Sequence, residues 1–539
     1  MTASRPRILV LGLDGAGLDL VLRFAAEGRM PNLSALMARG ARAPLLSTTP
    51  ATTFPAWTGF LTGAAPSSHG VPDFTVREGY RVRFVGARDR RLPTVFRHLE
   101  SRGLTCGAAW FPATYPPEPL AGYQISGWDS PVTARGDSSF VHPRGLFREL
   151  VAAFGRDALS FGAADEFGRD PGWREKAATA LPRGVRRRAE MAAFLLAKRP
   201  VDMAAFHFGE ADTAAHHFWP FHDPGSPRRP ASFDARLSRV LADVYEALDD
   251  AVGLLVAAAG PGASVIVLSD HGSGGSSDVA LHLNRMLEHA GLLTFRPARL
   301  RALTPERLRG AIPGLVDARL RRPLFRLAGG LLPSLAESHV RFGRIDFPRT
   351  VAFSEELGYA PSVWFNELGR EPRGALSHRS RERAALAVEK AASGLSLDDG
   401  TRLVAEVIRR KDLHRGRYAH LFPDLTLALA RPRGYTPACL PSLGESGPAV
   451  TRIVGPALLG AKGRSLPGCH TPEGLLVAVG PGVPANVRVQ ARIEDVADLV
   501  CALLGAPRAP WFEGRSPEGL PQSVPDPSNV APHVVEDRR

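Results

Sequence analysis

Short apolar runs recur along the chain, and each lies beside acidic or small residues. Residues 7–13 end in Asp14-Gly, residues 201–208 precede Gly-Glu-Ala-Asp, and residues 264–268 precede Ser-Asp-His-Gly. A fourth run, residues 475–479, follows Cys-His-Thr-Pro-Glu-Gly and leads into Gly-Pro-Gly. Compact apolar runs with such boundaries are typical of buried central strands. They predict a sheet with carboxylates at its strand ends, where open α/β sheets bind their ligands.

Helical stretches such as residues 233–258 separate these runs. Strands that alternate with helices predict an α/β fold with a mostly parallel central sheet. The chain has 539 residues, which is longer than a single core usually grows. We therefore expect one large core that is interrupted by an insertion.

The pattern changes between about residues 281 and 412, where basic amphipathic pieces alternate with Pro and Gly. These pieces, residues 299–320 and 321–332, carry no acidic strand ends and predict an inserted cap or lid. Four leucines at helical spacing form an apolar stripe: Leu320, Leu324, Leu327 and Leu331. We expect this stripe to pack on its own domain, with peripheral contact to a membrane surface as the alternative.

After Gly514 the sequence turns Pro-rich and polar, which predicts a flexible tail. The expected organisation is a core in two parts, residues 1–280 and 413–515, with a cap at 281–412 and a tail at 516–539.

Composition changes this picture only slightly. The formal net charge is +13, but five of the 67 basic residues are Lys and the rest are Arg. This excess of Arg over Lys is as typical of a GC-rich genome as of nucleic-acid binding, and we favour the explanation by genome composition. No apolar run reaches the ~18–20 residues of a membrane span. The four Cys are widely spaced without a C-x-x-C pair, so we expect a reducing, cytoplasmic location.

Thr53 is the first candidate for chemistry. It precedes Phe-Pro and leads into a predicted helix, and the free N–H groups of a helix N-terminus favour an anion such as phosphate. Thr is also a common helix cap, so the residue alone does not establish catalysis.

Acidic and imidazole side chains follow two other predicted strands. Asp212 and His216 have i, i+4 spacing, which places them on one helix face, and Asp270 adjoins His271. Oxygen and nitrogen donors of this kind suit zinc or manganese. Each pair alone also fits a helix cap beside a surface His, but several strand-end clusters together favour a metal site.

The order of these motifs resembles a known family. Asp-Gly follows the first strand, then come Thr-Phe-Pro with Thr-Gly and Ser-His-Gly, Asp-x3-His, Asp-His-Gly and a late Gly-x-His-x-x-x-Gly. The core, residues 7–280 and 423–514, resembles the type I phosphodiesterases and nucleotide pyrophosphatases of the alkaline phosphatase superfamily. TYPPEP at 114–119 and HHFW at 216–219 are similar to a bacterial branch of predicted phosphohydrolases or phosphomutases.

The resemblance implies an alkaline-phosphatase-like three-layer sandwich with an inserted cap. It also implies two divalent metal ions, zinc in most relatives and manganese as the alternative, and a phosphohydrolase of phosphodiesterase type that reacts through a phosphothreonine intermediate. Thr53 would be the nucleophile. One metal would be held by Asp14, Asp270, His271 and Thr53, and the other by Asp212, His216 and His470.

Some positions depart from the family pattern. Two Asn of nucleotide pyrophosphatases correspond to Ala56 and Phe74, which argues against a nucleotide diester as substrate. Phe74 is a candidate for contact with an apolar leaving group, although a core position is the preferred interpretation. His217 is a further candidate for substrate contact, and a solvated loop is its alternative. His69 is expected to be structural, and Gly272–Gly275 to form a flexible turn.

Two other functions fit parts of the sequence. A phosphomutase or phosphotransferase acting on a sugar phosphate or other phosphomonoester would share the metals. A non-catalytic Arg-rich protein that binds nucleic acid or a membrane surface would not retain every ligand position. We therefore expect an enzyme with a small-molecule phosphoester substrate and no nucleic-acid partner.

Overall fold

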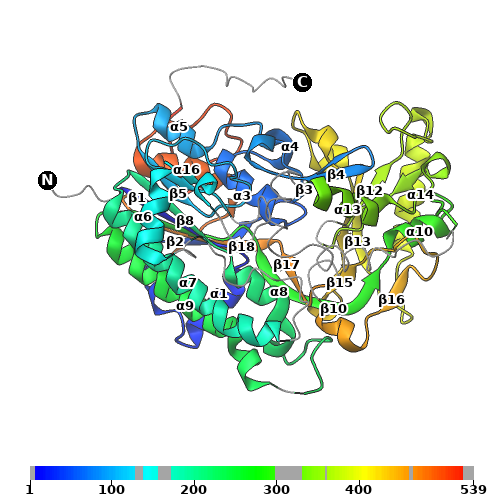
Figure 1. Cartoon of the computed structure of the whole chain (residues 1–539), viewed down its shortest axis with the longest axis horizontal. Coiled ribbons are helices and arrows are strands. Elements are labelled where there is room, and N and C mark those ends of the chain that lie inside the picture. Colours follow the sequence, from blue (N-terminus) through cyan, green and yellow to red (C-terminus); the bar gives the residue numbers. More distant parts are fainter. Residues whose placement is uncertain are drawn as a thin grey trace.

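A ten-stranded sheet is the centre of the computed structural model, which describes residues 6–127, 137–155, 159, 172–232, 234–297, 331–358, 361–460 and 465–525. The strand order is β19-β2-β18-β9-β1-β8-β5-β6-β7, with β20 beside β2. Strands β1, β2, β5, β8 and β18 of this sheet are labelled in Figure 1. The bounds are β1 Ile8–Leu13, β2 Ala41–Leu46, β5 Cys106–Ala109, β6 Tyr123–Ile125, β7 Val141–His142, β8 Met203–Phe208, β9 Ser264–Leu268, β18 Glu473–Val479, β19 Val487–Arg488 and β20 Ala491–Arg492.

Most neighbouring strands of this sheet are parallel, as the sequence predicts. The central strand β1 is parallel to both β8 and β9, whereas β18 is antiparallel to both β2 and β9. Residues 264–268 form β9 as expected, and β1 begins one residue later than the apolar run. The four predicted central strands are therefore confirmed.

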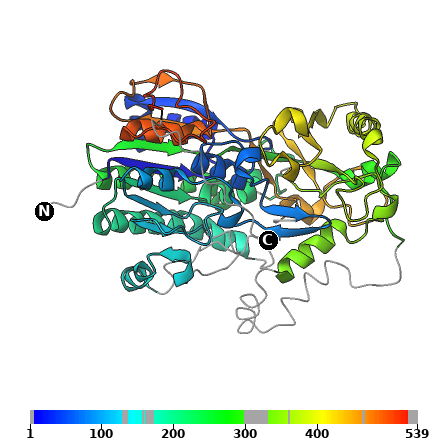
Figure 2. The same ribbon diagram turned by 90° about the horizontal axis from the view of Figure 1, so that it is seen from above.

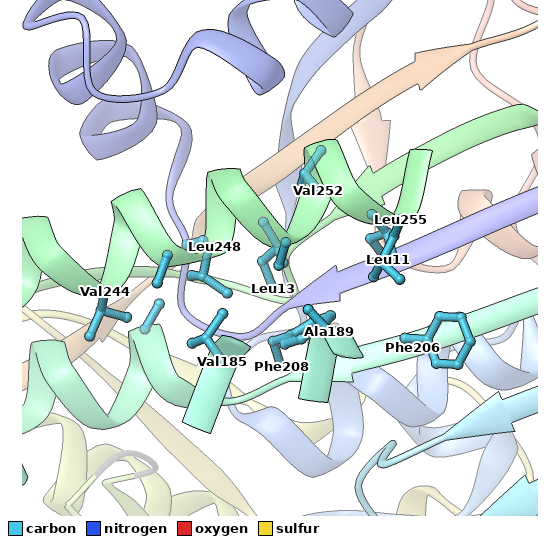
Figure 3. Close-up of a cluster of buried hydrophobic side chains, with 14 of the residues drawn as sticks. Leu11, Leu13, Val185, Ala189, Phe206, Phe208, Val244, Leu248, Val252 and Leu255 are labelled. Atoms are coloured by element: carbon cyan, nitrogen blue, oxygen red, sulfur yellow. The ribbon is translucent and has the colours of Figure 1, made fainter. Parts of the chain in front are cut away.

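Helices cover both faces of the sheet, so the core has three layers. Leu11 and Leu13 of β1 face a cluster that includes α7 and α9, and Figure 3 shows these side chains against Phe206 and Phe208 of β8. Ile8 and Val10 alternate with them and pack on the opposite face. The first face carries α1 Leu18–Ala26, α2 Pro31–Arg39, α6 Gly145–Phe154, α7 Trp173–Lys198, α8 Glu210–His222 and α9 Ala235–Ala259, and the second carries α3 Thr53–Thr62, α5 Val95–Ser101 and α16 Asp495–Leu504.

A second lobe stands beside this core, as Figures 1 and 2 both show. It is built on a four-stranded sheet of order β11-β12-β14-β13 and has its own apolar cluster. Its elements are β11 Ala352–Phe353, β12 Ser362–Phe365, β13 Val404–Arg409, β14 Leu425–Leu429, α10 Leu283–His289, α13 Leu331–Phe342, α14 Arg381–Ser393 and α15 Arg410–Leu413.

The second lobe occupies the place of the expected cap and continues past residue 412, because β14 ends at Leu429. The hairpin of β3 Thr75–Glu78 and β4 Arg81–Phe84 also reaches it, since Val82 belongs to the apolar cluster of this lobe. The Leu stripe lies outside the described residues, apart from the backbone of Leu331 in α13.

A long strand, β10 Gly272–Leu281, connects the two lobes and corrects the turn expected at Gly272–Gly275. These glycines pair with β17 Gly468–Thr471, and β10 also pairs with β15 Thr436–Cys439 and β16 Val450–Arg452. A Cβ atom on Gly272 would lie 2.4 Å from the carbonyl oxygen of Glu473. The glycines therefore serve close strand packing rather than a turn.

The C-terminal segment also differs from the expected tail. The Ser516 N–H donates to Asp498 of α16 at 2.9 Å, and Leu520 is buried. The chain thus contacts the core as far as Val524, whose carbonyl oxygen accepts from the Arg508 N–H at 2.9 Å. The expected tail beyond residue 525 lies outside the described residues. None of the described helices is both long enough and apolar enough to cross a lipid bilayer.

Candidate active site

Elements from distant parts of the sequence bring the predicted site residues together. Asp14 directly follows β1, and Thr53 is the first residue of α3. Asp212 and His216 occupy successive turns of α8, while Asp270 and His271 connect β9 to β10. His470 lies on β17 opposite Ser273.

The first group of donors surrounds the Nε2 atom of His271. This atom lies 3.5 Å from Oδ1 of Asp14, 3.3 Å from Oδ2 of Asp270 and 3.2 Å from the Thr53 hydroxyl oxygen. The other ring nitrogen, Nδ1, donates to the Gly272 carbonyl oxygen at 3.0 Å. That bond fixes the tautomer, so the Nε2 lone pair faces the two carboxylates.

The second group places two imidazoles in contact. Nε2 of His216 lies 3.0 Å from Nε2 of His470, and the two atoms are 3.1 and 3.4 Å from Oδ1 of Asp212. Each ring donates its Nδ1–H to a backbone carbonyl oxygen, that of Gly468 at 3.0 Å and that of Ala51 at 2.8 Å. Both Nε2 atoms are therefore directed at each other and at the Asp212 carboxylate. A divalent cation between them would be coordinated by all three groups.

Asp212 belongs to both groups. Its carboxylate lies with His216 and His470 in one set of donors within 4.8 Å of one another, and with Asp14 and His271 in a second such set. Asp14 Oδ1, Asp212 Oδ1 and Asp270 Oδ2 are buried and accept no hydrogen bond from the described residues. Buried oxygens without donors are costly unless a cation is present. The donor set therefore fits divalent metal ions.

Electrostatics within the site support the same conclusion. Burial, together with the charges of Asp14 and Asp212, raises the pKa of Asp270 well above its usual value. Burial and the neighbouring His470 lower the pKa of His271 to about 4. Burial opposes ionisation of Asp212, but the two adjacent imidazoles outweigh it and hold that pKa well below normal. A divalent cation would favour the ionised carboxylates and the neutral imidazoles.

Two residues that were not predicted from the sequence hold the Asp14 carboxylate in place. Its Oδ2 atom accepts a hydrogen bond from the Trp57 indole at 2.9 Å and lies 3.0 Å from Nε2 of His207. Trp57 is one helical turn after Thr53 in α3, and His207 lies in β8 beside β1. These contacts leave Oδ1 of Asp14 directed at the first group. The available signal in the sequence was a His within an otherwise apolar strand, which indicates a buried polar contact.

The loops that carry these donor residues are connected to one another by hydrogen bonds. Ser269 accepts the Ala16 N–H at 2.9 Å and donates to the His271 carbonyl oxygen at 2.7 Å, while Ser273 donates to the Gly15 carbonyl oxygen. Gly15 has a φ of 71°, and a Cβ there would lie 2.9 Å from Cα of Asp212. Glycine after Asp14 is therefore required by both conformation and space.

The weaker candidates lie in apolar surroundings. Phe74 packs edge-on against Phe54 and Phe84, with ring centroids 4.9 and 5.3 Å apart. His217 is buried with its ring 4.5 Å from Trp173. His69 is buried and accepts the Val71 N–H at 3.2 Å, and burial lowers its pKa to about 3.

Comparisons with known proteins identify the family. The model of the type I phosphodiesterase/nucleotide pyrophosphatase family matches residues 8–435, and no curated protein matches the chain. Human ectonucleotide pyrophosphatase/phosphodiesterase 5 is 12% identical over 94% of this chain and 97% of that chain, with a TM-score of 0.49. Phosphonoacetate hydrolase from Sinorhizobium meliloti 1021, in complex with phosphonoformate, is 14% identical over 92% and 95%, with a TM-score of 0.49.

The sheet is mostly parallel and carries carboxylates, imidazoles and a hydroxyl at its strand ends, and the chain is matched by this family model. Together these findings define a phosphoester hydrolase. Since the match covers most of its length, the chain belongs to the type I phosphodiesterase/nucleotide pyrophosphatase family. The family, the fold class and the enzymatic nature expected from the sequence are confirmed. Enzymes of this family act on small phosphoesters.

Proposed function

We propose that the protein is a metal-dependent phosphodiesterase-type hydrolase that cleaves its substrate through a phosphothreonine intermediate at Thr53. The position of the Thr53 hydroxyl carries this proposal, because it lies 3.2 Å from Nε2 of His271 and at the first residue of α3. Backbone N–H groups at that helix end favour a bound phosphoryl oxygen.

The donor groups support two adjacent metal sites. Asp14, Asp270, His271 and Thr53 would hold one divalent ion, and Asp212, His216 and His470 the other. Three imidazoles favour Zn²⁺, with Mn²⁺ as the alternative. When bound, such ions would act as Lewis acids that stabilise negative charge on the entering and leaving oxygens.

The chain's own residues orient the reaction. Thr53 Oγ1 would form a bond to phosphorus while the bond to the leaving alcohol breaks, and water would then cleave the threonyl ester and restore the hydroxyl. Trp57 and His207 keep Asp14 in place, and the carbonyl partners of the three His keep their Nε2 atoms directed inward. These contacts preorganise the site before substrate arrives.

The substrate is better described as a non-nucleotide phosphoester. Ala56 and Phe74 stand where nucleotide pyrophosphatases have Asn, and Phe74 packs in a small apolar cluster with Phe54 and Val71. We infer that the core carries the reaction while the second lobe selects the substrate. Four cysteines without disulfides support a reducing compartment, and we place the protein in the bacterial cytoplasm.

The experiment compares Thr53→Ala with Thr53→Ser and with Thr52→Ala, a matched change at the adjacent N-cap residue whose side chain makes no capping bond. Turnover of bis(p-nitrophenyl) phosphate should fall about 10³-fold or more in Thr53→Ala and persist in Thr53→Ser. Acid quenching with a ³²P-labelled diester should trap phosphothreonine at residue 53. Activity of Thr53→Ala within about threefold of the wild type would refute the nucleophile.

Chelation tests the requirement for metal independently of the identity of the nucleophile. Dialysis against a chelator should abolish turnover and lower the melting temperature, and Zn²⁺ or Mn²⁺ should restore both. Product analysis with a sugar phosphate and an acceptor alcohol decides between a hydrolase and a phosphomutase. A protein that keeps full activity after chelation, with less than one metal ion per chain, would overturn the metal assignment.

A further inference from the structure

A cavity lies between the core and the second lobe. It has a volume of about 40 Å³ and opens to solvent, and its walls come from the segment that contains β3, from β12, and from residues 414–426. The polar side chains that matter here are Asp73, Ser362, His414 and Thr426, and the apolar wall includes Trp364 and Phe422.

The cavity adjoins the site built around Thr53. Pro50 lines it, and the next residue, Ala51, supplies the carbonyl oxygen that accepts from Nδ1 of His470. Asp73 is close enough to His470 for the two side chains to interact electrostatically. A molecule whose phosphoryl group lies at Thr53 can therefore extend into this space.

The charges around the cavity are mostly paired with one another. Arg77 forms a two-pronged ion pair with Glu371 at 2.8 Å, and Arg341 binds Glu355 at 2.7 Å. Asp73 has no such pair among the described residues, so the balance of the lining is negative. A ligand with a second phosphate or a carboxylate is disfavoured by that balance.

The remaining polar groups suit hydroxyls. The Ser362 and Thr426 side chains are 4% exposed each and line the cavity. His414 is 6% exposed, and its Nε2 atom has no hydrogen-bond partner in the described chain. Burial lowers the pKa of His414 to about 4, so the ring is neutral and its Nε2 atom exchanges a hydrogen bond with an uncharged ligand.

The aromatic groups do not form a cage for a cation. The guanidinium of Arg77 lies 3.9 Å from the centre of the Trp364 ring, and the ring of Phe422 lies 3.9 Å from that of His414. A positive ligand would meet a face of Trp364 that already carries a cation. The walls are therefore better suited to the C–H surface of a neutral ligand.

We propose that this cavity binds one alcohol of the substrate ester, and that this alcohol is an uncharged vicinal polyol of the glycerol or sugar type. Its hydroxyls donate to Asp73 and exchange hydrogen bonds with Ser362, Thr426 and His414, while its carbons contact Trp364. This inference rests on the proposed phosphodiesterase function and specifies its substrate class.

The test uses the full-length, metal-loaded enzyme and a series of p-nitrophenyl phosphodiesters that differ only in the second alcohol. The alcohols are glycerol, glucose linked through its primary hydroxyl, n-propanol and choline. The wild-type kcat/KM should be about tenfold or more higher for a polyol ester than for the propyl ester, because a site built for hydroxyls rejects the analogue that lacks them. The glycerol and glucose arms decide which polyol fits.

Variants connect that preference to the cavity. Asp73→Asn and Thr426→Val should each bring the polyol-to-propyl ratio of kcat/KM toward one, whereas Ser393→Ala, an exposed hydroxyl change in α14, should leave the ratio as it is. A wild-type enzyme that prefers the propyl or choline ester, or variants that keep the polyol preference, would overturn the proposal. Failure to cleave any of the four esters would instead count against the phosphodiesterase function.

Discussion

Gly12→Ala tests whether the hydrogen bond that holds Asp14 in place matters, because it disturbs that contact without changing any of the proposed metal ligands. Gly12 lies in β1, and a Cβ there would come within 2.6 Å of Cη2 and 3.0 Å of Cζ3 of Trp57. The indole has no free space to accept the methyl group, since it is fully buried with Phe111 and His207 rings 5.4 and 4.9 Å away. Trp57 must therefore shift.

The shift has two separate costs. Overpacking of a closed core costs about 1–3 kcal/mol of unfolding free energy. Displacing the indole also weakens its 2.9 Å hydrogen bond to Asp14, which is worth about 1 kcal/mol or more because the acceptor is a carboxylate. We expect Gly12→Ala to lower the free energy of unfolding by about 2–4 kcal/mol, and the affinity for metal by about 10–100-fold.

Urea unfolding of the metal-free protein and Zn²⁺ competition with a chromophoric chelator measure the two effects. Gly262→Ala is the matched control, because a Cβ at Gly262 meets no atom within 4 Å. Adding Trp57→Phe to Gly12→Ala should recover part of the stability but not the metal affinity, since Phe has no N–H group. The reasoning is refuted if Gly12→Ala unfolds like Gly262→Ala and binds Zn²⁺ like the wild type.

Three further outcomes are expected. His207→Gln should weaken Zn²⁺ binding about tenfold, by the same competition, with little change in the urea midpoint. Asp424→Asn should destabilise the second lobe by about 2–3 kcal/mol in urea, because Arg370, Arg381 and Arg410 all bind this buried carboxylate. Asp73→Asn should stabilise the metal-free protein by at most about 3 kcal/mol at pH 8 and by less than about 1 kcal/mol at pH 4; a gain that is independent of pH would contradict this.

The sign of the Asp73 effect follows from its titration. Burial raises the pKa of Asp73 from 3.8 to about 6. As pH rises between these values, the unfolded chain releases its proton before the folded one, so folding loses free energy across that window and does not regain it above. Asn carries no proton to release, so the variant avoids the loss.

The central strands could be predicted from the sequence because burial on both faces makes them continuously apolar. The run at residues 264–268 coincides with β9, and the carboxylates and imidazoles fall at strand ends where parallel packing gathers them. The positions of Thr53 and His470 relative to these groups were predicted through the family resemblance rather than through local pattern.

Other features depend on partners that the local sequence does not contain. Gly272 and its neighbours look like a turn until β17 lies against them, some two hundred residues later in the chain. His207 looks like any strand residue until β1 places Asp14 beside it. Strand β13 of the second lobe, Val404–Arg409, is half exposed and rich in charge, so no apolar run indicated it.

The place of β18 in the sheet has a consequence for biosynthesis. This strand is made some two hundred residues after β9 and later still than β2, yet it lies between them in the sheet. Until residues 473–479 leave the ribosome, those two strands have open, apolar edges and cannot complete the sheet. His470 is synthesised just before these residues. A nascent chain therefore exposes these two edges to aggregation until β18 has been made, and the second group of donors, which includes His470, is complete no earlier.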